Sequence, residues 1–341
     1  MKISQENIIA SLRHENSYVH PIRYVKVIET HISWILLTGP YAYKVKKAVK
    51  FGSILDFSKL HLRKRYCEEE VLLNRPLCDG MYTSVVKIIS RGGDVSIVNL
   101  SCKGKAIEYA VKMLEIPQEH RMDNLLRAGK VNGDTIRSLT RKLVKFHSNT
   151  KTNVRITSFG SPQFMISKIK ENFLTLSKLT KSGEIYAQRL MHFVKNNESL
   201  FLLRMKQGRI REIHGDLYLR NIFLSKKKFY LYDRIEFNTP LRYADVVEDL
   251  AHLGMDLDFH QREDLRKLAI SDYIKQTGDN ILIDLIYFMM CYKSCVRAKV
   301  SLFRASQAVG KDGYLNRGID KECKQEARAH FALARKYMRL C

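Results

Sequence analysis

The sequence lacks the cysteine patterns that mark disulfide-rich and zinc-binding proteins. Its 341 residues contain seven cysteines, an odd number, and no two of them form a CxxC pair. An odd and scattered set predicts reduced thiols and no disulfide framework. No cluster of cysteine and histidine has the spacing of zinc ligands, so we expect no structural zinc. The seven are Cys67, Cys78, Cys102, Cys291, Cys295, Cys323 and Cys341.

Long apolar segments are also missing. The first residues, MKISQENIIASLRHENSY, have no apolar core like that of a signal peptide. The most apolar run, ILIDLIYFMMCYKSC from Ile281, is too short to span a bilayer and carries Asp284 near its start. We find no internal repeat and no low-complexity segment. We therefore expect a cytoplasmic protein with no membrane partner.

Acidic residues are few compared with basic ones. The chain has 35 Asp and Glu against 59 Lys and Arg, which gives a formal charge of +24. Such an excess attracts polyanions such as nucleic acid, nucleotide phosphate or an acidic lipid surface. The basic residues are spread along the whole chain, however, and a solvated surface explains them equally well. Binding of nucleic acid through a basic surface is thus an alternative that we do not favour.

What the sequence does contain is material for a large globular core. Its hydrophobic fraction of 45% and aromatic fraction of 10% are ordinary for such proteins. The first third predicts six strands around one helix, which begins at Asp56 or Ser58 and ends near Leu77. The predicted strands are Tyr24–Thr30, Ser33–Leu37, Tyr41–Val49, Ser84–Ile89, Val95–Leu100 and Glu108–Leu114.

The rest of the chain has mainly helical patterns. Asp245 followed by Glu248 is a helix start signal. The predicted helices are Arg137–Ser148, Phe173–Lys195, Ala244–Leu257, Glu263–Gln276, Ile281–Ser306 and Lys321–Leu340. These patterns predict an α+β fold, in which a β-rich lobe of residues 1–116 joins a mostly helical lobe of residues 117–341.

One stretch interrupts the helical part, EIHGDLYLRNIFLSKKKFYLYD at residues 212–233. Two β-prone runs flank a polar turn, which predicts a hairpin. If the hairpin is centred on Lys227, Asn221 lies opposite Asp233, and Asp216 enters from the preceding loop. Three oxygen-bearing side chains at one end of a hairpin suit magnesium. The alternative is that these residues cap turns and end a strand.

The same stretch resembles a known family. HGDLYLRN is similar to the HxDxxxxN catalytic loop of the kinase-like fold, in the form typical of aminoglycoside phosphotransferase-type small-molecule kinases. Further segments resemble, in the same order, the kinase-like half of bacterial fusion proteins that join an aminoglycoside phosphotransferase-like part to an ATP-binding part. They are THISW, YAYKVKKAVKFG, LDFS, CEEEVLLNRPL, VKMLEIPQ, YDRIEFN and LRYADVVEDLAHLGMDLD.

This resemblance covers most of the chain and implies a two-lobed protein-kinase-like fold. In the fusion proteins a P-loop ATPase domain often follows the kinase-like part. The chain contains no GxxxxGK[ST] motif, so we expect the kinase-like unit alone.

The resemblance also implies roles for residues of the catalytic loop. Asp216 would be the catalytic base that accepts the proton of the acceptor hydroxyl. Asn221 and Asp233 would hold Mg²⁺, which bridges the phosphates of ATP. His214 would brace the loop or, less in keeping with the pattern, take a direct part in the chemistry.

A phosphate-binding lysine is expected on the third strand. Lys44 and Lys46 both qualify because residues two apart share a face of a strand. The motif alignment favours Lys44, with Lys46 as a surface or phosphate-steering charge. The partner expected on the following helix is Glu70, with Glu69 as its rival.

The remaining nucleotide contacts are expected at two places. The adenine ring would lie against the segment that joins the lobes, which includes Met113, Leu114 and Glu115. The turn over the phosphates contains no glycine, unlike that of protein kinases, so Thr30 and Ser33 would contact phosphate through their hydroxyl groups or backbone amides.

Together these features predict an ATP-dependent phosphotransferase that acts on the hydroxyl group of a small molecule. The alternatives are a protein or peptide kinase, a nucleotide-binding regulator with little turnover, and a basic nucleic-acid-binding protein. The excess of positive charge argues against a polycationic aminoglycoside as acceptor, although a set of acidic residues weakens that argument. The set is Asp245, Glu248, Asp249, Asp256 and Asp258. The acceptor, the oligomeric state and the choice between ATP and GTP stay open.

Overall fold

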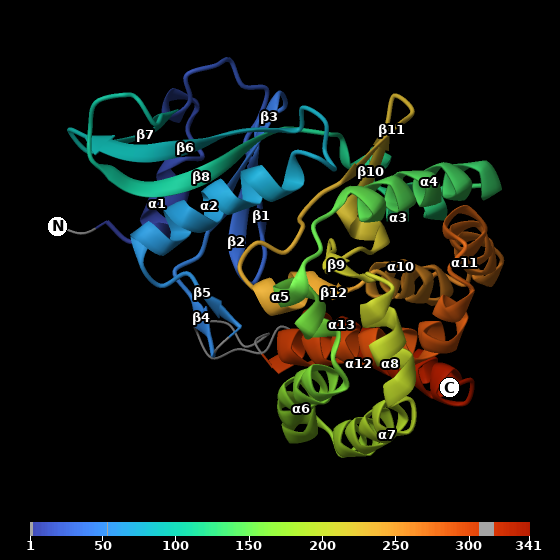
Figure 1. Ribbon diagram of the computed structural model, residues 1–341. Helices are drawn as coiled ribbons and strands as arrows, with labels where there is room; N and C mark the ends of the chain where they lie inside the picture. The colour runs from blue at the N-terminus through green and yellow to red at the C-terminus, as the bar shows by residue number, and fades with distance from the viewer. Residues whose placement is uncertain (1–2, 53, 307–316) are drawn as a thin grey trace. The chain divides into compact units, whose positions relative to one another are not determined.

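The computed structural model describes residues 3–52, 54–306 and 317–341 (Figure 1). The chain divides into two compact units. The first contains the residues up to Leu125 together with Arg220–Thr239, and the second contains Leu126–Leu219 together with Pro240–Cys341. The division thus falls nine residues later than the predicted boundary after residue 116, and the hairpin belongs to the β-rich unit.

The first unit is built on a six-stranded antiparallel sheet with the order β1-β2-β3-β8-β6-β7. All six strands predicted in the first third are present, with ends shifted by a few residues. Their bounds are β1 Lys26–Glu29, β2 Ser33–Leu37, β3 Tyr41–Lys46, β6 Tyr82–Arg91, β7 Asp94–Asn99 and β8 Ala106–Leu114. A small pair, β4 Lys50–Phe51 and β5 Leu55–Asp56, follows β3.

Helix α2, Leu60–Asn74, lies along β8 and β6 (Figure 1). Its buried residues are Arg63, Cys67, Glu70, Val71 and Asn74. They recur three or four positions apart, so they form one face of the helix. Because this face is partly polar, the helix brings charged groups as well as apolar ones against the sheet. On the sheet's other side, α1 (Gln5–Ser11) contributes Ile8 and Ile9 to an apolar core.

The predicted hairpin forms from β10 (Ile222–Ser225) and β11 (Lys228–Leu231). Ser225 pairs with Lys228, so the turn consists of the two residues Lys226 and Lys227. Both have positive φ, 49° and 63°, which is the conformation that a type I′ turn requires and that suits the twist of a hairpin.

The register therefore differs by one residue from the predicted one, which was wrong. Asn221 lies opposite Tyr232, whose N–H donates to the carbonyl oxygen of Asn221 at 3.0 Å. Asp233 is the next residue and lies beyond the end of the strand. The sequence pattern missed this because lysine rarely occupies a turn that needs positive φ at both positions.

The second unit is mostly helical. Its long helix α12 (Ile283–Ser306) packs against both α10 (Val247–Phe259) and α13 (Arg317–Met338). Helix α4 (Gly133–Asn149) packs against α11 (Glu263–Thr277). These helices correspond to predicted ones.

Two predictions for this unit were wrong. Phe173–Lys195 is not one helix, because α6 (Pro162–Leu179) ends and α7 (Ser182–Asn196) begins after a corner. Gly183 makes this corner tight, since a Cβ there would lie 2.7 Å from the backbone nitrogen of Ser177. A short strand β12 (Tyr243–Asp245) also precedes α10 and pairs with β9 (Ile210–Glu212).

The remaining elements are short. They are the helices α3 Met122–Arg127, α5 Val154–Thr157, α8 Glu198–Lys206 and α9 Thr239–Arg242, and the 3₁₀ turns Glu15–Ser17, Gln118–His120, Ser158–Gly160, Leu219–Asn221 and Asn280–Leu282. Among the helices of the described residues, none combines the length and the apolar character needed to cross a membrane.

Candidate functional site

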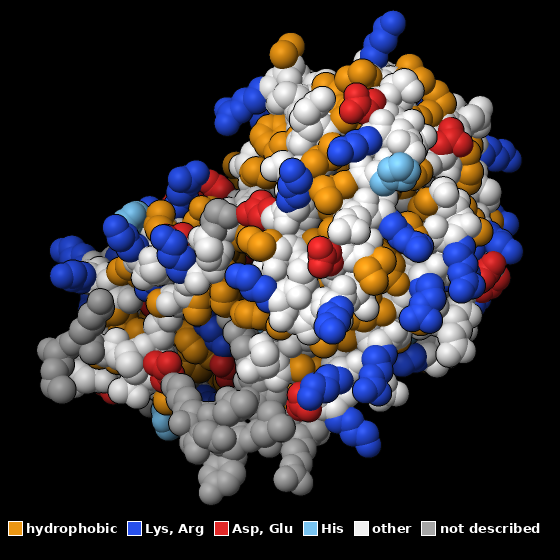
Figure 2. Space-filling model, turned by 90° about the horizontal axis from the view of Figure 1, so that it is seen from below, with side chains coloured by type: hydrophobic (Ala, Val, Ile, Leu, Met, Phe, Trp, Pro, Cys, Tyr) orange, Lys and Arg blue, Asp and Glu red, His pale blue; other side chains and the backbone are white. Residues whose placement is uncertain are grey.

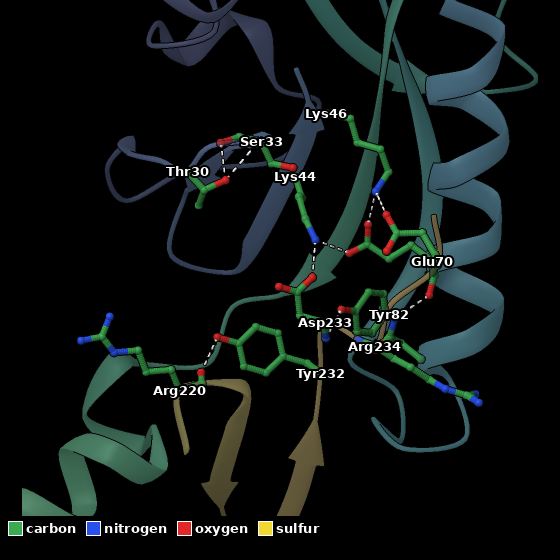
Figure 3. A network of polar contacts seen from close by, with 12 residues as sticks. Thr30, Ser33, Lys44, Lys46, Glu70, Tyr82, Arg220, Tyr232, Asp233 and Arg234 are labelled. Carbon is green, nitrogen blue, oxygen red and sulfur yellow. Dashed lines mark hydrogen bonds and ion pairs between the residues drawn. The ribbon is translucent and has the colours of Figure 1, made fainter. Parts of the chain in front are cut away.

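The two lysines of β3 both meet one glutamate of α2 (Figure 3). Lys44 Nζ lies 2.9 Å from one carboxylate oxygen of Glu70, and Lys46 Nζ lies 2.6 Å from the other. Strand alternation places both lysines on the same face. Glu69, the rival partner, is instead paired with Arg65 at 2.9 Å on the helix surface. The structure therefore brings Lys44, Lys46 and Glu70 together.

Lys44 also contacts the residue that ends the hairpin. Its Nζ lies 2.5 Å from Asp233 Oδ1, and the Asp233 side chain is 40% exposed. Burial alone would lower the pKa of Lys44, but Asp233 and Glu70 raise it well above its ordinary value. Lys44 therefore stays charged and holds the accessible carboxylate of Asp233.

Lys46 is not a surface charge, contrary to the expectation from sequence. Its side chain is fully buried and pairs with Glu236 as well as with Glu70. Burial raises the pKa of Glu236, while the charge of Lys46 opposes this increase. Two lysines and two glutamates thus form a buried network, with Asp233 at its exposed end.

The backbone around Asp233 is held in an unusual conformation. Asp233 has φ of +64°, which costs a residue with a Cβ about 1–2 kcal/mol, although aspartate adopts it more readily than most. Its N–H donates to the Tyr82 hydroxyl at 3.1 Å, and the next N–H, of Arg234, donates to Asn74 Oδ1 at 3.0 Å. A strained residue that its surroundings fix in this way is typical of functional sites.

The turn between β1 and β2 contains the two predicted phosphate contacts. The Thr30 hydroxyl donates to the carbonyl oxygen of Ser33 and accepts from its N–H, both at 3.0 Å (Figure 3). The Thr30 N–H also donates to Ser33 O at 2.8 Å. These bonds close the turn without glycine, but they use the Thr30 hydroxyl internally. The Ser33 hydroxyl oxygen is buried and has no hydrogen-bond partner among the described residues.

Residues of the segment predicted to bind adenine make hydrogen bonds within the first unit. The N–H of Leu114 donates to Met81 O at 2.8 Å, and that of Glu115 donates to Pro40 O at 3.2 Å. The Glu115 carboxylate accepts from the N–H groups of Thr38 and Gly39 at 2.9 and 2.8 Å. Glu115 therefore fixes the turn between β2 and β3.

Met113, the first of the three residues named for this segment, is buried and pairs with Ala42 in the sheet. Leu114 has an exposed side chain. The structure thus gives Met113 a packing role and leaves Leu114 at the surface.

In the second unit, α10 holds the loop that carries Asp216. The carboxylate of Asp249 accepts the N–H groups of His214 and Gly215 at 2.8 and 2.9 Å. Two turns further along the helix, Asp256 accepts the N–H of Leu219 at 2.7 Å. Because these two aspartates are seven residues apart, they lie on one face of the helix. They fix both ends of the loop.

The Asp249 carboxyl group strongly favours its charged, deprotonated form. Burial would raise its pKa, but hydrogen bonds from His147 and from the loop hold that pKa well below its ordinary value. His147 lies 3.1 Å from Asp249 through Nε2 and 2.8 Å from the Tyr273 hydroxyl through Nδ1. His147 therefore holds in place the Asp249 carboxylate that fixes the loop.

His214 is fully buried behind this loop. Its Nδ1 accepts the N–H of Asp216 at 3.3 Å, which requires that Nδ1 carries no proton. This contact is the kind that a bracing residue makes. The Asp216 side chain itself is 36% exposed.

Several important residues were not singled out from the sequence. Glu236, Tyr82 and Asn74 were missed because their role depends on contacts between distant segments. Asp249 and Asp256 were noted only as part of an acidic set. Their spacing of seven residues on a predicted helix was the signal that could have identified them as partners of one loop.

The residues predicted to bind magnesium fit it by their chemistry. Asp233 offers an accessible carboxylate and Asn221, which is 4% exposed, an amide oxygen. The described residues contain no group of three His, Cys, Asp or Glu side chains that could hold a metal ion. One carboxylate and one amide, without a closed cage, suit an ion that retains waters and binds substrate phosphates.

Comparison with curated proteins finds relatives of unknown activity. Uncharacterized proteins of Mycobacterium tuberculosis and Mycobacterium bovis are 31% identical over 298 residues, which cover 84% of this chain and 57% of each relative. The chain therefore spans little more than half the length of the curated relatives that it matches. No protein-family profile matches the sequence.

Comparison with solved structures is more specific about the fold. A choline kinase from Cryptosporidium parvum Iowa II has a TM-score of 0.53 at 12% identity, covering 98% of this chain and 96% of that one. An ethanolamine kinase of Plasmodium vivax has a TM-score of 0.52 at 14% identity, covering 91% and 82%. The streptomycin–ATP–APH(2")-IIa ternary complex has a TM-score of 0.50 at 13% identity, covering 96% and 97%.

These similarities confirm the predicted fold class, a β-rich first region followed by a mostly helical one. The chain has the kinase-like fold that aminoglycoside phosphotransferases share with choline and ethanolamine kinases.

Proposed function

We propose that the chain is an ATP-dependent phosphotransferase that transfers the γ-phosphate to a hydroxyl group of a small molecule. The observation that carries this proposal is the network of Lys44, Glu70 and Asp233. A buried lysine that a glutamate holds in place, next to an accessible carboxylate, is what binding of a metal–nucleotide complex requires.

The first unit would supply the nucleotide-binding residues. Lys44 would contact phosphate oxygens, and Glu70 would keep its ammonium group oriented. Asp233 and Asn221 would hold Mg²⁺, which would offset the negative charge that develops during transfer. Thr30, Ser33 and the Met113–Glu115 segment would complete the nucleotide contacts.

The second unit would supply the base. Asp216 accepts the proton as the O–H bond of the acceptor breaks, and the acceptor oxygen forms a bond to the γ-phosphorus. The bond from that phosphorus to the oxygen bridging to the β-phosphate breaks, and its electron pair leaves with ADP. Asp249, Asp256 and His214 would keep Asp216 in one orientation by fixing its loop.

A small acceptor is supported by the names of the similar structures, which are a choline kinase, an ethanolamine kinase and a complex of APH(2")-IIa with streptomycin and ATP. A nucleic-acid acceptor or partner finds less support. On the face seen in Figure 2, lysine and arginine side chains are interspersed with apolar, neutral and acidic ones and do not gather in one stripe.

The test measures Mg²⁺-dependent ATP binding by calorimetry and slow release of ADP for three proteins. These are the wild type, Asp216→Ala and Asp233→Ala. We expect Asp233→Ala to weaken binding of Mg²⁺–ATP. We expect Asp216→Ala to bind nucleotide as the wild type does but to lose turnover by about 10²-fold or more, the usual contribution of a general base.

Matched controls are aspartates on the surface of the same units. Asp79 in the first unit and Asp134 in the second are 78% and 88% exposed, and their alanine variants should keep wild-type binding and turnover. If the wild type binds no nucleotide, or if Asp216→Ala turns over normally, the proposal is wrong.

A further inference from the structure

Four side chains of the second unit form a contiguous cluster beside the proposed base. His252 Nδ1 lies 3.8 Å from Asp216 Oδ1. The Tyr218 ring stacks on the His252 ring, with centroids 5.5 Å apart. The Arg297 guanidinium lies over the Tyr218 ring at 4.7 Å from its centroid. We call these residues, Asp216, Tyr218, His252 and Arg297, the Asp216 cluster.

Two members of the Asp216 cluster have polar groups with few or no hydrogen-bond partners among the described residues. The His252 side chain is 4% exposed, yet neither ring nitrogen has a hydrogen-bond partner among the described residues. Arg297 is 15% exposed, and in the described part of the chain its only hydrogen bond goes to Glu326 at 3.3 Å. A guanidinium carries five N–H groups. A buried imidazole whose two nitrogens have no partner is costly, so this arrangement is expected where a ligand supplies one, and the partly exposed Arg297 has N–H groups to donate to the same ligand.

The five carboxylates of the acidic set noted in the sequence are all engaged in other contacts. Asp249 and Asp256 accept the loop amides. The other three acids of α10 and its start pair with basic side chains in the interior: Asp245 with Arg204, Glu248 with Lys168 and Lys293, and Asp258 with Arg266. The acidic set noted in the sequence therefore does not provide a negative surface for an acceptor.

Positive charge is instead present at the loop. Lys293 Nζ lies 3.4 Å from the carbonyl oxygen of Gly215, and Arg297 follows one helical turn later on α12. Burial, together with Lys293 and Arg297, lowers the pKa of His252 well below its ordinary value, so its ring is neutral near pH 7. The donors available beside Asp216 thus include one fixed cation and one neutral imidazole.

We propose that the acceptor is a hydroxyl compound that carries an anionic oxygen group, a carboxylate or a phosphate, and that Arg297 binds this group. Arginine suits the role because its planar fork can donate two parallel hydrogen bonds to such a group. The Tyr218 ring fixes the plane of the fork, and His252 lies where it can hydrogen-bond the acceptor hydroxyl beside Asp216. This inference rests on the proposed function and gives its acceptor a chemical class. It differs from the cationic compounds that the names of the similar structures contain, which are ethanolamine, choline and the bound streptomycin.

The test uses four three-carbon compounds that differ in one group. Glycerate carries a carboxylate, glycerol 3-phosphate a phosphate, glycerol no charge, and 3-amino-1,2-propanediol a cation. Each is titrated calorimetrically into the wild type in the presence of Mg²⁺ and ADP. We expect at least one of the two anions to bind about tenfold or more tightly than glycerol and the amine, and the stronger of the two identifies carboxylate or phosphate as the group.

The variants assign this preference to one residue. Arg297→Gln should lose the preference for the anion, while Arg297→Lys, which keeps the charge but not the fork, should retain part of it. Arg304→Gln is the matched control, because Arg304 lies on the same helix and also contacts Glu326, at 3.5 Å. Thermal unfolding of each variant verifies that it is folded. If Arg297→Gln does not fold, Arg297→Lys decides, because an undiminished preference for the anion in that variant would contradict the inference.

Three results would overturn the inference: equal or absent binding of all four compounds by the wild type, tightest binding of the amine, or a preference that survives in both Arg297 variants. Titration of the same samples with Mg²⁺–ATP distinguishes failure of the anionic-acceptor inference from failure of the proposed function. Nucleotide binding without anion preference refutes only the acceptor class, whereas absence of nucleotide binding refutes the phosphotransferase itself.

Discussion

At the scale of single residues, the two lysines of β3 have different consequences when removed. Without Lys44, Glu70 still has Lys46 as a partner. Without Lys46, Glu236 loses the basic partner that it has in the buried network. Removal of one member of a buried ion pair usually costs about 3–5 kcal/mol.

We therefore predict that Lys46→Met lowers the free energy of unfolding by about 3–5 kcal/mol, measured by urea denaturation. The double variant Lys46→Met/Glu236→Gln should recover part of this loss. Lys50→Met is the control, since Lys50 is 62% exposed and pairs with Asp56 at the surface. It should change stability by no more than about 0.5 kcal/mol. Equal effects of Lys46→Met and Lys50→Met would contradict the buried network.

A second residue-scale prediction concerns pH. Burial, with Arg297 and His260 nearby, lowers the pKa of His330 to about 3, although Glu326 lies 3.9 Å from its Nε2. In the unfolded chain histidine titrates near pH 6.5. Below that pH the unfolded state binds a proton that the folded state does not, so stability is full above pH 6.5 and falls as the pH decreases toward 3.

Between pH 7 and pH 5 this one group should therefore remove about 2 kcal/mol of stability. His330→Gln should reduce the difference between urea unfolding energies at the two pH values by a similar amount. His192→Gln, which changes an exposed histidine, should leave the difference as it is in the wild type. An unchanged pH dependence in His330→Gln would show that folding does not lower the pKa of this histidine.

At the scale of elements, the hairpin turn carries avoidable strain. Lys226 and Lys227 both adopt positive φ, which costs a residue with a Cβ about 1–2 kcal/mol and costs glycine little. Lys227→Gly should therefore raise the free energy of unfolding by about 1 kcal/mol, measured by urea denaturation. Lys227→Ala removes the same charge but keeps the Cβ, so it should give no such gain. A loss of stability in the glycine variant would argue against this turn.

The same elements indicate how far the sequence determines the structure. Strands and amphipathic helices were predictable because their hydrophobic periodicity is local. The hairpin's existence was predictable for that reason too, but its register was not, since a two-lysine turn gives none of the usual glycine or asparagine signals. The corner between α6 and α7 was missed because it depends on one close approach at Gly183.

The candidate site, too, could be predicted from the sequence only in part. The pairing of Glu70 with Lys44 could be anticipated from a motif, and the shared face of Lys44 and Lys46 from strand alternation. The role of Glu236, and the inward position of Lys46, could not, because each depends on which distant segments meet. Likewise, Asp249 and Asp256 could be recognised as partners of the loop only once the loop was seen against their helix.

At the scale of the whole molecule, the proposed residues divide between the two units. Lys44, Glu70 and Asp233 belong to the first, and Asp216 with the residues that fix its loop belongs to the second. Binding of nucleotide and its turnover should therefore respond to different substitutions.

The most direct test of the account is a calorimetric titration of the wild-type chain with ATP, with and without Mg²⁺. The account predicts saturable binding that Mg²⁺ strengthens and that Lys44→Met weakens by about tenfold or more, the loss expected for a charge-assisted contact to phosphate. The surface variant Lys50→Met should bind as the wild type does. Absence of binding by the folded wild type, or binding that is indifferent to both Mg²⁺ and Lys44, would contradict the account.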